Sequence, residues 1–234
     1  MLASNSVGSF WKWRWMIERA ADVLREGGIR GLWFKMLGKM VYRRVVLVER
    51  ALDEPVPEVT ARLPLVIDLL KESEVDEYVG FFPRGNVSET RRRLEAGQLC
   101  FVARHRGRLV CANWATTKAA WIPYLGCTIQ LAPGEVYTYE LFTSPDFRGQ
   151  NIAPAVKAHQ LRQFRRAGYS RAVAVIVPEN TASLRADGKV GYSPYGVMGC
   201  VRLGPWRRDF CRIHKSNDLR RATIANDGLR ETDA

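Results

Sequence analysis

The sequence has no cysteine pattern that would indicate a disulfide framework or a zinc site. Its five cysteines are odd in number, and no two of them form a Cys-x-x-Cys pair. It also lacks an apolar run of the roughly 18–20 residues that cross a bilayer, a secretory leader pattern and any internal repeat. We therefore expect a cytoplasmic protein with reduced, mostly buried thiols and no bound metal.

Acidic residues are scarce relative to basic ones. The 234 residues include 24 Asp and Glu against 36 Lys and Arg, which gives a formal net charge of +12. Such a charge indicates an anionic partner, such as a nucleotide cofactor, a membrane surface, an acidic protein or a nucleic acid. The basic residues are scattered and no nucleic-acid-binding motif occurs, so nucleic acid is the least favoured of these partners.

Residues 136–153 predict a strand, a tight turn and the start of a helix. The strand is rich in β-branched and aromatic side chains, and Pro145 follows its end. Apolar residues then recur at helical spacing from Asn151 onward, at Ile152, Val156, Leu161 and Phe164. This geometry directs backbone N–H groups and the positive end of a helix at one point, which suits an anion.

A second unit of the same kind follows. Residues 171–178 are a short apolar run typical of a buried strand, and Asn180 stands just past its end at the start of a helix. Lys189-Val-Gly-Tyr192 closes the segment.

At these residues the chain resembles the GNAT superfamily of N-acyltransferases. The family's pyrophosphate-binding signature is Arg/Gln-x-x-Gly-x-Gly/Ala, and here Arg148-Gly-Gln-Asn-Ile-Ala153 stands in its place. Asn151 replaces the middle glycine, and asparagine tolerates positive φ better than most residues. The resemblance covers about residues 63–203. It implies an α+β fold with a mixed, mostly antiparallel central sheet flanked by helices.

The resemblance also implies a reaction, in which an acyl-CoA thioester donates an acetyl or longer acyl group to an amine of a small molecule or peptide. No metal takes part. The implied cofactor contacts are Leu141, Phe142, Thr143, Arg148, Gly149, Gln150, Asn151, Ile152, Ala153, Asn180, Ser183 and Lys189.

The groups that would move protons are less clear from the sequence. Glu140 is the candidate general base, because we expect it beside the cleft on the same face as Phe142. Its other interpretation is an ordinary solvated or salt-bridged strand residue. Many family members have a tyrosine as general acid, but counting from Asn180 places Asp187 there. Tyr192 and Tyr139 are candidate substitutes, and the general acid stays open.

Candidate substrate-binding residues are aromatic. An uncharged insertion between Lys118 and Gly134 carries Trp121 and Tyr124. It is interpreted either as the lining of an apolar pocket for a long acyl chain or acceptor, or as a hydrophobic loop over the core. The complete candidate set is Trp114, Trp121, Tyr124 and Tyr139.

Three regions are predicted along the chain: an extension and linker over 1–57, the acyltransferase domain over 58–206, and a polar tail over 207–234. Residues 10–44 read as two basic amphipathic helices rich in tryptophan. They predict either an anchor on an anionic membrane, at its inner face, or packing against the core or another subunit. We expect a strand at 45–52 before the domain, and within the domain strands at 63–70, 99–104 and 108–116 and helices at 72–82 and 88–96. The last strands are a candidate homodimer surface.

Two other functions remain open. A catalytically inactive acyl-CoA sensor is favoured by Asn151 and by the missing tyrosine. A fatty-acyl transferase whose donor is an acyl carrier protein is favoured by the net charge, since an acidic carrier would suit a basic enzyme.

Overall fold

The computed structural model describes residues 41–213 and 224–225, so the predicted helices within 10–44 lie almost wholly outside the described residues. The chain divides into two compact units. Among described residues, the larger unit comprises 44–198, 211–213 and 224–225, and the smaller comprises 41–43 and 199–210. Within residues 41–213 and 224–225, no helix has the length and apolar character needed to cross a bilayer.

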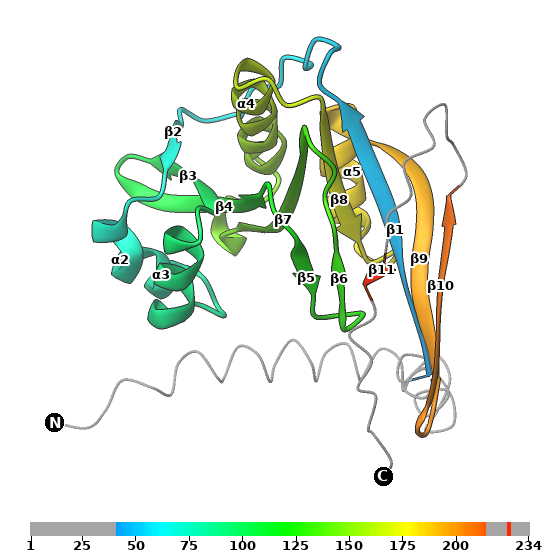
Figure 1. Cartoon of the computed structure of the whole chain (residues 1–234). Coiled ribbons are helices and arrows are strands. Elements are labelled where there is room, and N and C mark those ends of the chain that lie inside the picture. The colour runs from blue at the N-terminus through cyan, green and yellow to red at the C-terminus, as the bar shows by residue number, and fades with distance from the viewer. Residues whose placement is uncertain (1–40, 214–223, 226–234) are drawn as a thin grey trace, which may run out of the picture. The chain divides into compact units, whose positions relative to one another are not determined.

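The main element is an eight-stranded sheet, shown in Figure 1. Its strands run in the order β10 (Trp206–Ile213), β9 (Ser193–Leu203), β1 (Tyr42–Ala51), β8 (Arg171–Ile176), β7 (Glu135–Thr143), β4 (Arg108–Thr116), β3 (Leu99–His105) and β2 (Val66–Leu69). The β1–β8, β2–β3, β3–β4 and β4–β7 pairs are antiparallel, whereas β7 and β8 are parallel. The predicted α+β class with a mixed, mostly antiparallel sheet is confirmed.

The helices cover both faces of this sheet, and the alternation of strand residues decides which helix each side chain meets. On β3, Cys100 and Val102 pack with α2 (Val75–Phe81) and α3 (Val87–Glu95). Phe101 and Ala103 alternate with them, and on the other face of the sheet they pack in the cluster that contains residues of α4 (Ile152–Arg166). The apolar residues of α4 predicted from their spacing are all buried there. Two 3₁₀ helices, Glu72–Glu74 and Pro145–Phe147, precede α2 and α4.

β1 is a strand of the main sheet although it precedes residue 58, where the predicted domain begins. Val46–Ala51 pairs antiparallel with β8, more than one hundred residues later in the chain. The strand itself was predicted, but its partner was not, because pairing between distant strands leaves no local signal. The domain boundaries therefore stay a prediction.

The uncharged insertion forms a hairpin of β5 (Ala120–Ile122) and β6 (Cys127–Ile129). It belongs to a second sheet in the order β11 (Ile224–Ala225), β6, β5. Ile122 and Leu125 are buried in a cluster with Val45, Leu47 and Met198. The structure thus agrees with the interpretation in which the insertion packs on the core.

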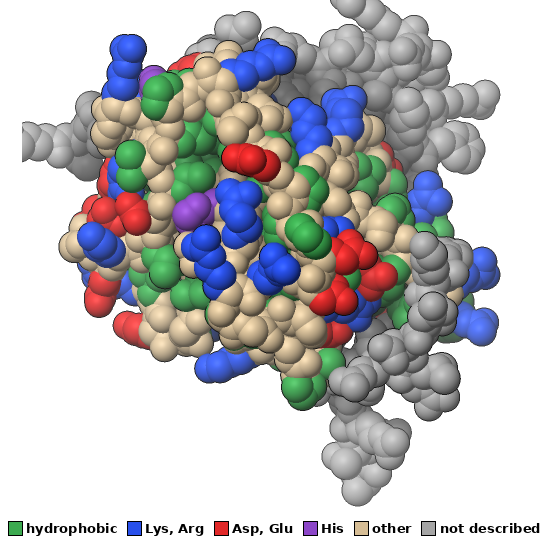
Figure 2. Space-filling model, turned by 90° about the horizontal axis from the view of Figure 1, so that it is seen from above, with side chains coloured by type: hydrophobic (Ala, Val, Ile, Leu, Met, Phe, Trp, Pro, Cys, Tyr) green, Lys and Arg blue, Asp and Glu red, His purple; other side chains and the backbone are tan. Residues whose placement is uncertain are grey.

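Strand β10 was not predicted, since residues 207–234 were interpreted as a polar tail. Four of its eight residues are charged, three of them arginine, and charged side chains are common on edge strands. The five cysteines are all free thiols, four buried and one half-buried. On the face seen in Figure 2, lysine and arginine side chains gather near the centre and acidic ones lie mostly toward the sides.

Candidate functional site

A pocket of about 550 Å³ lies where the end of β7 meets the beginnings of α4 and α5 (Thr181–Lys189). It brings together every residue predicted to contact the cofactor except Gln150, which does not line it. These residues come from three segments that span 49 positions of the sequence, so their meeting in one pocket is a result of the fold. Their roles remain predictions, whereas their common location is a finding.

Positive charge dominates the lining of this pocket. Arg148, Arg185 and Lys189 face it, and no carboxylate is among the described residues that line it. The first turn of α4 adds the unpaired N–H groups of a helix N-terminus. Within residues 41–213 and 224–225, no group of three His, Cys, Asp or Glu side chains is arranged to hold a metal. The pocket is suited to an extended anion.

The loop before α4 has the backbone that an anion-binding turn requires. Gly149 has φ +79°, a region in which any side chain would be strained, and space beyond its Cα is open. Asn151 follows in the left-handed conformation, with φ 60° and ψ 21°. The predicted tolerance of asparagine for positive φ at this position is confirmed, and the turn survives the loss of the family's middle glycine.

The side chain of Asn151 is held to one side by two hydrogen bonds. Its Nδ2 donates to the carbonyl of Thr60 (2.8 Å), and its Oδ1 accepts from Nζ of Lys189 (2.8 Å). The backbone N–H of Arg62 also donates to the carbonyl of Gln150 (2.9 Å). Residues 60–62 therefore brace the loop from outside, and the amide has fixed partners other than a bound anion.

β7 leaves its parallel neighbour at the pocket. Its pairing with β8 runs from Glu135 to Thr138 and, among described residues, does not continue to Thr143. On its other side, the register with β4 shifts at Asn113, opposite Glu140, whose φ is +49°. This bulge breaks the alternation that sequence reasoning assumed between Glu140 and Phe142. Among described residues, the backbone of residues 141–143 has no strand partner on the β8 side, and there the Thr143 carbonyl accepts a hydrogen bond from Nε of Arg148 (3.3 Å).

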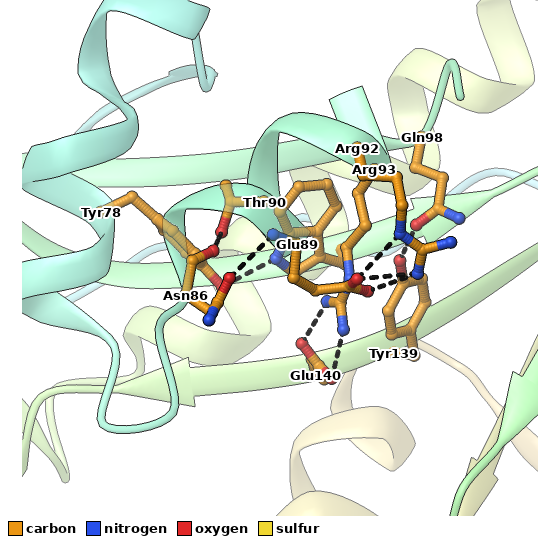
Figure 3. A network of polar contacts seen from close by, with 10 residues as sticks. Tyr78, Asn86, Glu89, Thr90, Arg92, Arg93, Gln98, Tyr139 and Glu140 are labelled. Atoms are coloured by element: carbon orange, nitrogen blue, oxygen red, sulfur yellow. Dashed lines mark hydrogen bonds and ion pairs between the residues drawn. The ribbon is translucent and has the colours of Figure 1, made fainter. Parts of the chain in front are cut away.

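Glu140 is engaged by Arg93 of α3, as Figure 3 shows. The two guanidinium nitrogens lie 2.5 and 3.1 Å from its carboxylate oxygens. Arg93 also donates to Glu89 (3.0 Å) and lies over the rings of Trp114 and Tyr139, at 5.4 and 5.6 Å from their centroids. Burial disfavours the guanidinium charge, but the hydrogen bonds to Glu140 and Glu89 and the charge of Glu140 outweigh it and raise the pKa of Arg93. Arg93 therefore stays charged and fixes the position of Glu140.

Tyr192, the candidate acid, does not line the pocket. It is buried, its hydroxyl lies 3.2 Å from Oγ1 of Thr138, and the ammonium of Lys157 lies 4.9 Å from its ring centroid. Burial, and next the charge of Asp187, raise the pKa of Tyr192. In this position it contributes to the core beneath α4.

The four candidate substrate-binding aromatics are also outside the pocket. Trp114 is fully buried and donates to the Tyr78 hydroxyl (2.8 Å), while the Tyr139 hydroxyl donates to Gln98. Trp121 is 61% exposed on β5. Tyr124 packs against the cluster that buries the insertion.

Sequence reasoning missed Arg185 and the pair that joins α4 to α5. Arg185 and Lys189 are four positions apart on α5, a helical spacing that was available as a signal. Lys157 and Asp187 form a buried ion pair with 2.6 Å between Nζ and Oδ1. No local pattern indicates that pair, since its members lie on different helices.

Comparison with known proteins agrees with this geometry. The model of the acetyltransferase (GNAT) family matches residues 67–192. No match to the sequence was found among curated proteins.

Among solved structures, the glucosamine N-acetyltransferase region of a fungal multi-domain β-N-acetylglucosaminidase is similar with 17% identity and a TM-score of 0.53, over 74% of this chain and 23% of that one. A protein from Novosphingobium aromaticivorans assigned to the GNAT family has 17% identity and a TM-score of 0.48, over 68% and 62%. An aminoglycoside N-acetyltransferase in complex with CoA has 20% identity and a TM-score of 0.45, over 55% and 91%. The chain thus spans less than two thirds of the first two proteins, and these likenesses concern the fold alone.

Proposed function

The chain belongs to the acetyltransferase (GNAT) family, and from this premise we propose that it transfers an acyl group from an acyl-CoA thioester to an amine. The observation that carries the proposal is the pocket at the β7, α4 and α5 junction. It combines three cations, a helix N-terminus and, among described residues, a stretch of β7 that β8 does not pair with. Acyl-CoA has the matching parts: a diphosphate, an arm with two amides and a reactive end.

The diphosphate belongs at the loop before α4. Backbone N–H groups of residues 149–153 supply the donors, and Arg148 and Lys189 supply the charge. Arg185, on the facing helix, is close enough to the same pocket to add to the attraction. The amides of the pantetheine arm would then pair with the backbone of residues 141–143, which β8 leaves without a strand partner, as an added strand does. This orientation directs the thioester toward the bulge at Glu140.

The reaction is direct attack. The amine nitrogen forms a bond to the thioester carbonyl carbon, the carbon–sulfur bond breaks, and the amine loses a proton. Backbone N–H groups near Phe142 polarise the carbonyl. Glu140 accepts the proton, directly or through a water molecule, and Arg93 orients its carboxylate.

The leaving thiolate needs little help from an acid. Thiols have a pKa of about 8.5, so a thiolate is a tolerable leaving group near neutral pH. No Tyr, His or Cys is among the described residues that line the pocket, and solvent supplies the proton in our proposal. The acyl group is acetyl or longer, and the apolar insertion, which packs on the core and does not line this pocket, gives no support for a long chain.

Binding is tested by thermal shift with CoA, acetyl-CoA and palmitoyl-CoA, since a ligand stabilises the folded state that it binds. We expect stabilisation that Arg148→Glu weakens roughly tenfold or more in terms of apparent Kd. Arg166→Glu is the matched control, because Arg166 is exposed at the opposite end of α4. If Arg148→Glu binds CoA as the unchanged protein does, the assignment of this pocket is wrong.

Turnover is tested by thiol release with a panel of amines. Glu140→Gln should lower kcat by roughly 10²–10⁴-fold and leave CoA affinity unchanged. The second candidate, a sensor without catalysis, is favoured by the absence of a tyrosine from the pocket lining and by the ion pair on Glu140. CoA binding without thiol release for any amine would favour the sensor.

A further inference from the structure

The turn between β9 and β10 presents two large apolar side chains to solvent. Leu203, the last residue of β9, is 56% exposed, and Trp206, the first residue of β10, is 50% exposed. Gly204, with φ +59°, and Pro205 form the turn between them. We call residues 202–208 the hairpin tip. All of them belong to the smaller unit, so the surface is defined within that unit.

Arginines flank these apolar side chains. Residues 202–208 include Arg202, Arg207 and Arg208, all exposed, and no acidic residue. Arg207 is paired with Asp209 at 2.8 Å. Within the described part of the chain, Arg202 and Arg208 have no carboxylate at ion-pair distance. The hairpin tip therefore joins an apolar end to cations that are available for an anionic partner.

We propose that the hairpin tip docks on an anionic lipid bilayer. Trp206 and Leu203 enter the boundary between headgroups and acyl chains, where tryptophan is favoured, and Arg202 and Arg208 contact lipid phosphates. A bilayer suits this surface better than an acidic protein does. A stable protein interface needs about 800 Å² on each partner, which two side chains on a narrow turn do not provide, whereas lipid closes around a small insertion.

This inference does not depend on acyl transfer. It also differs from the sequence prediction for residues 10–44, because it rests on the described hairpin alone. If both hold, the hairpin and the extension contact the same kind of surface.

The experiment is vesicle co-sedimentation of the full chain, with phosphatidylcholine alone or mixed with phosphatidylglycerol. We expect binding to the mixed vesicles, and Trp206→Ser should weaken it roughly tenfold. Trp121→Ser is the matched control, since Trp121 is 61% exposed on a strand of the larger unit, and it should bind as the unchanged protein does. Arg202→Gln with Arg208→Gln should weaken binding about 30-fold, at roughly fivefold for each basic residue.

Several results would overturn the proposal. They are a full chain that ignores mixed vesicles, a Trp206→Ser variant that binds them normally, and an equal loss in Trp121→Ser. Loss of binding to an acidic carrier protein, with vesicle binding unchanged, would assign the hairpin tip to a protein partner instead. Thermal unfolding checks that each variant is folded. If Trp206→Ser does not fold, the variant with both arginines replaced tests whether the hairpin tip binds the bilayer.

Discussion

Replacing Lys157 alone should destabilise the protein far more than replacing both members of its ion pair. The Lys157 and Asp187 side chains are 4% and 2% exposed, and their charged atoms are 2.6 Å apart. No described residue donates a well-directed hydrogen bond to either carboxylate oxygen of Asp187. The ammonium is therefore the main compensation for a carboxylate that has lost its water, and Lys157→Met would leave that carboxylate buried without it.

The size of the effect follows from the distance and the burial. Coulomb's law with an effective dielectric constant of about 20 gives an attraction of about 6 kcal/mol at 2.6 Å. The desolvation of two ions offsets most of it, so the net contribution of the pair is small. Removal of one partner should nevertheless lower the free energy of unfolding by about 3–5 kcal/mol. Lys157→Met combined with Asp187→Leu should be nearly neutral, because no charge is left in the core.

Urea unfolding of the two single variants and the double variant measures this directly, from midpoints and slopes. Lys118→Met is the control, because its ammonium contacts only the Ala96 carbonyl in an exposed position among described residues, and its effect should stay within about 0.5 kcal/mol. A loss below about 1 kcal/mol for Lys157→Met would refute the reasoning. So would a double variant as unstable as the sum of the singles.

Three further outcomes are expected. Asn151→Ala should lower the free energy of unfolding by about 2–3 kcal/mol, from strain at positive φ and two lost hydrogen bonds, while Asn151→Gly, free of that strain, should lose less in urea unfolding. Burial, with the charges of Arg162 and Arg166, lowers the pKa of His159 from its ordinary 6.5, so folding favours the neutral ring. Stability should therefore fall as pH drops below about 6.5, and unfolding curves of His159→Gln should lack that decline. The half-buried Cys211 should react first with a thiol reagent, and the four buried thiols only after unfolding; equal rates for all five would contradict their burial.

The strand-turn-helix elements of the pocket could be predicted because their signals are local. The end of β7, the turn at Gly149 and the start of α4 follow one another in the chain, and residue type decides each of them. Asn180 is a similar case: its Oδ1 accepts from the Ser183 N–H (3.2 Å), so the side chain caps α5. For these segments, spacing and turn chemistry were enough.

Features that depend on distant parts of the chain could not be predicted. The bulge at Glu140 results from the register between β4 and β7, and Arg93 of a distant helix pairs with a carboxylate that the sequence left open between a general base and a salt-bridged strand residue. Tyr192 was a candidate acid without support from a motif, and packing beneath α4 buries its hydroxyl against Thr138. Residue type alone does not indicate that the core encloses the Tyr192 hydroxyl while Glu140 pairs with an arginine from another element.

The brace formed by residues 60–62 has a consequence for how small this protein can be made. A fragment trimmed to residues 67–192, where the family match lies, would keep every side chain that lines the pocket. It would nevertheless lose the Thr60 carbonyl that holds Asn151, the Arg62 amide that holds Gln150, and the β1 partner of β8. The anion-binding turn is contiguous in sequence but not autonomous, and its shape is maintained by a stretch of chain that does not line the pocket.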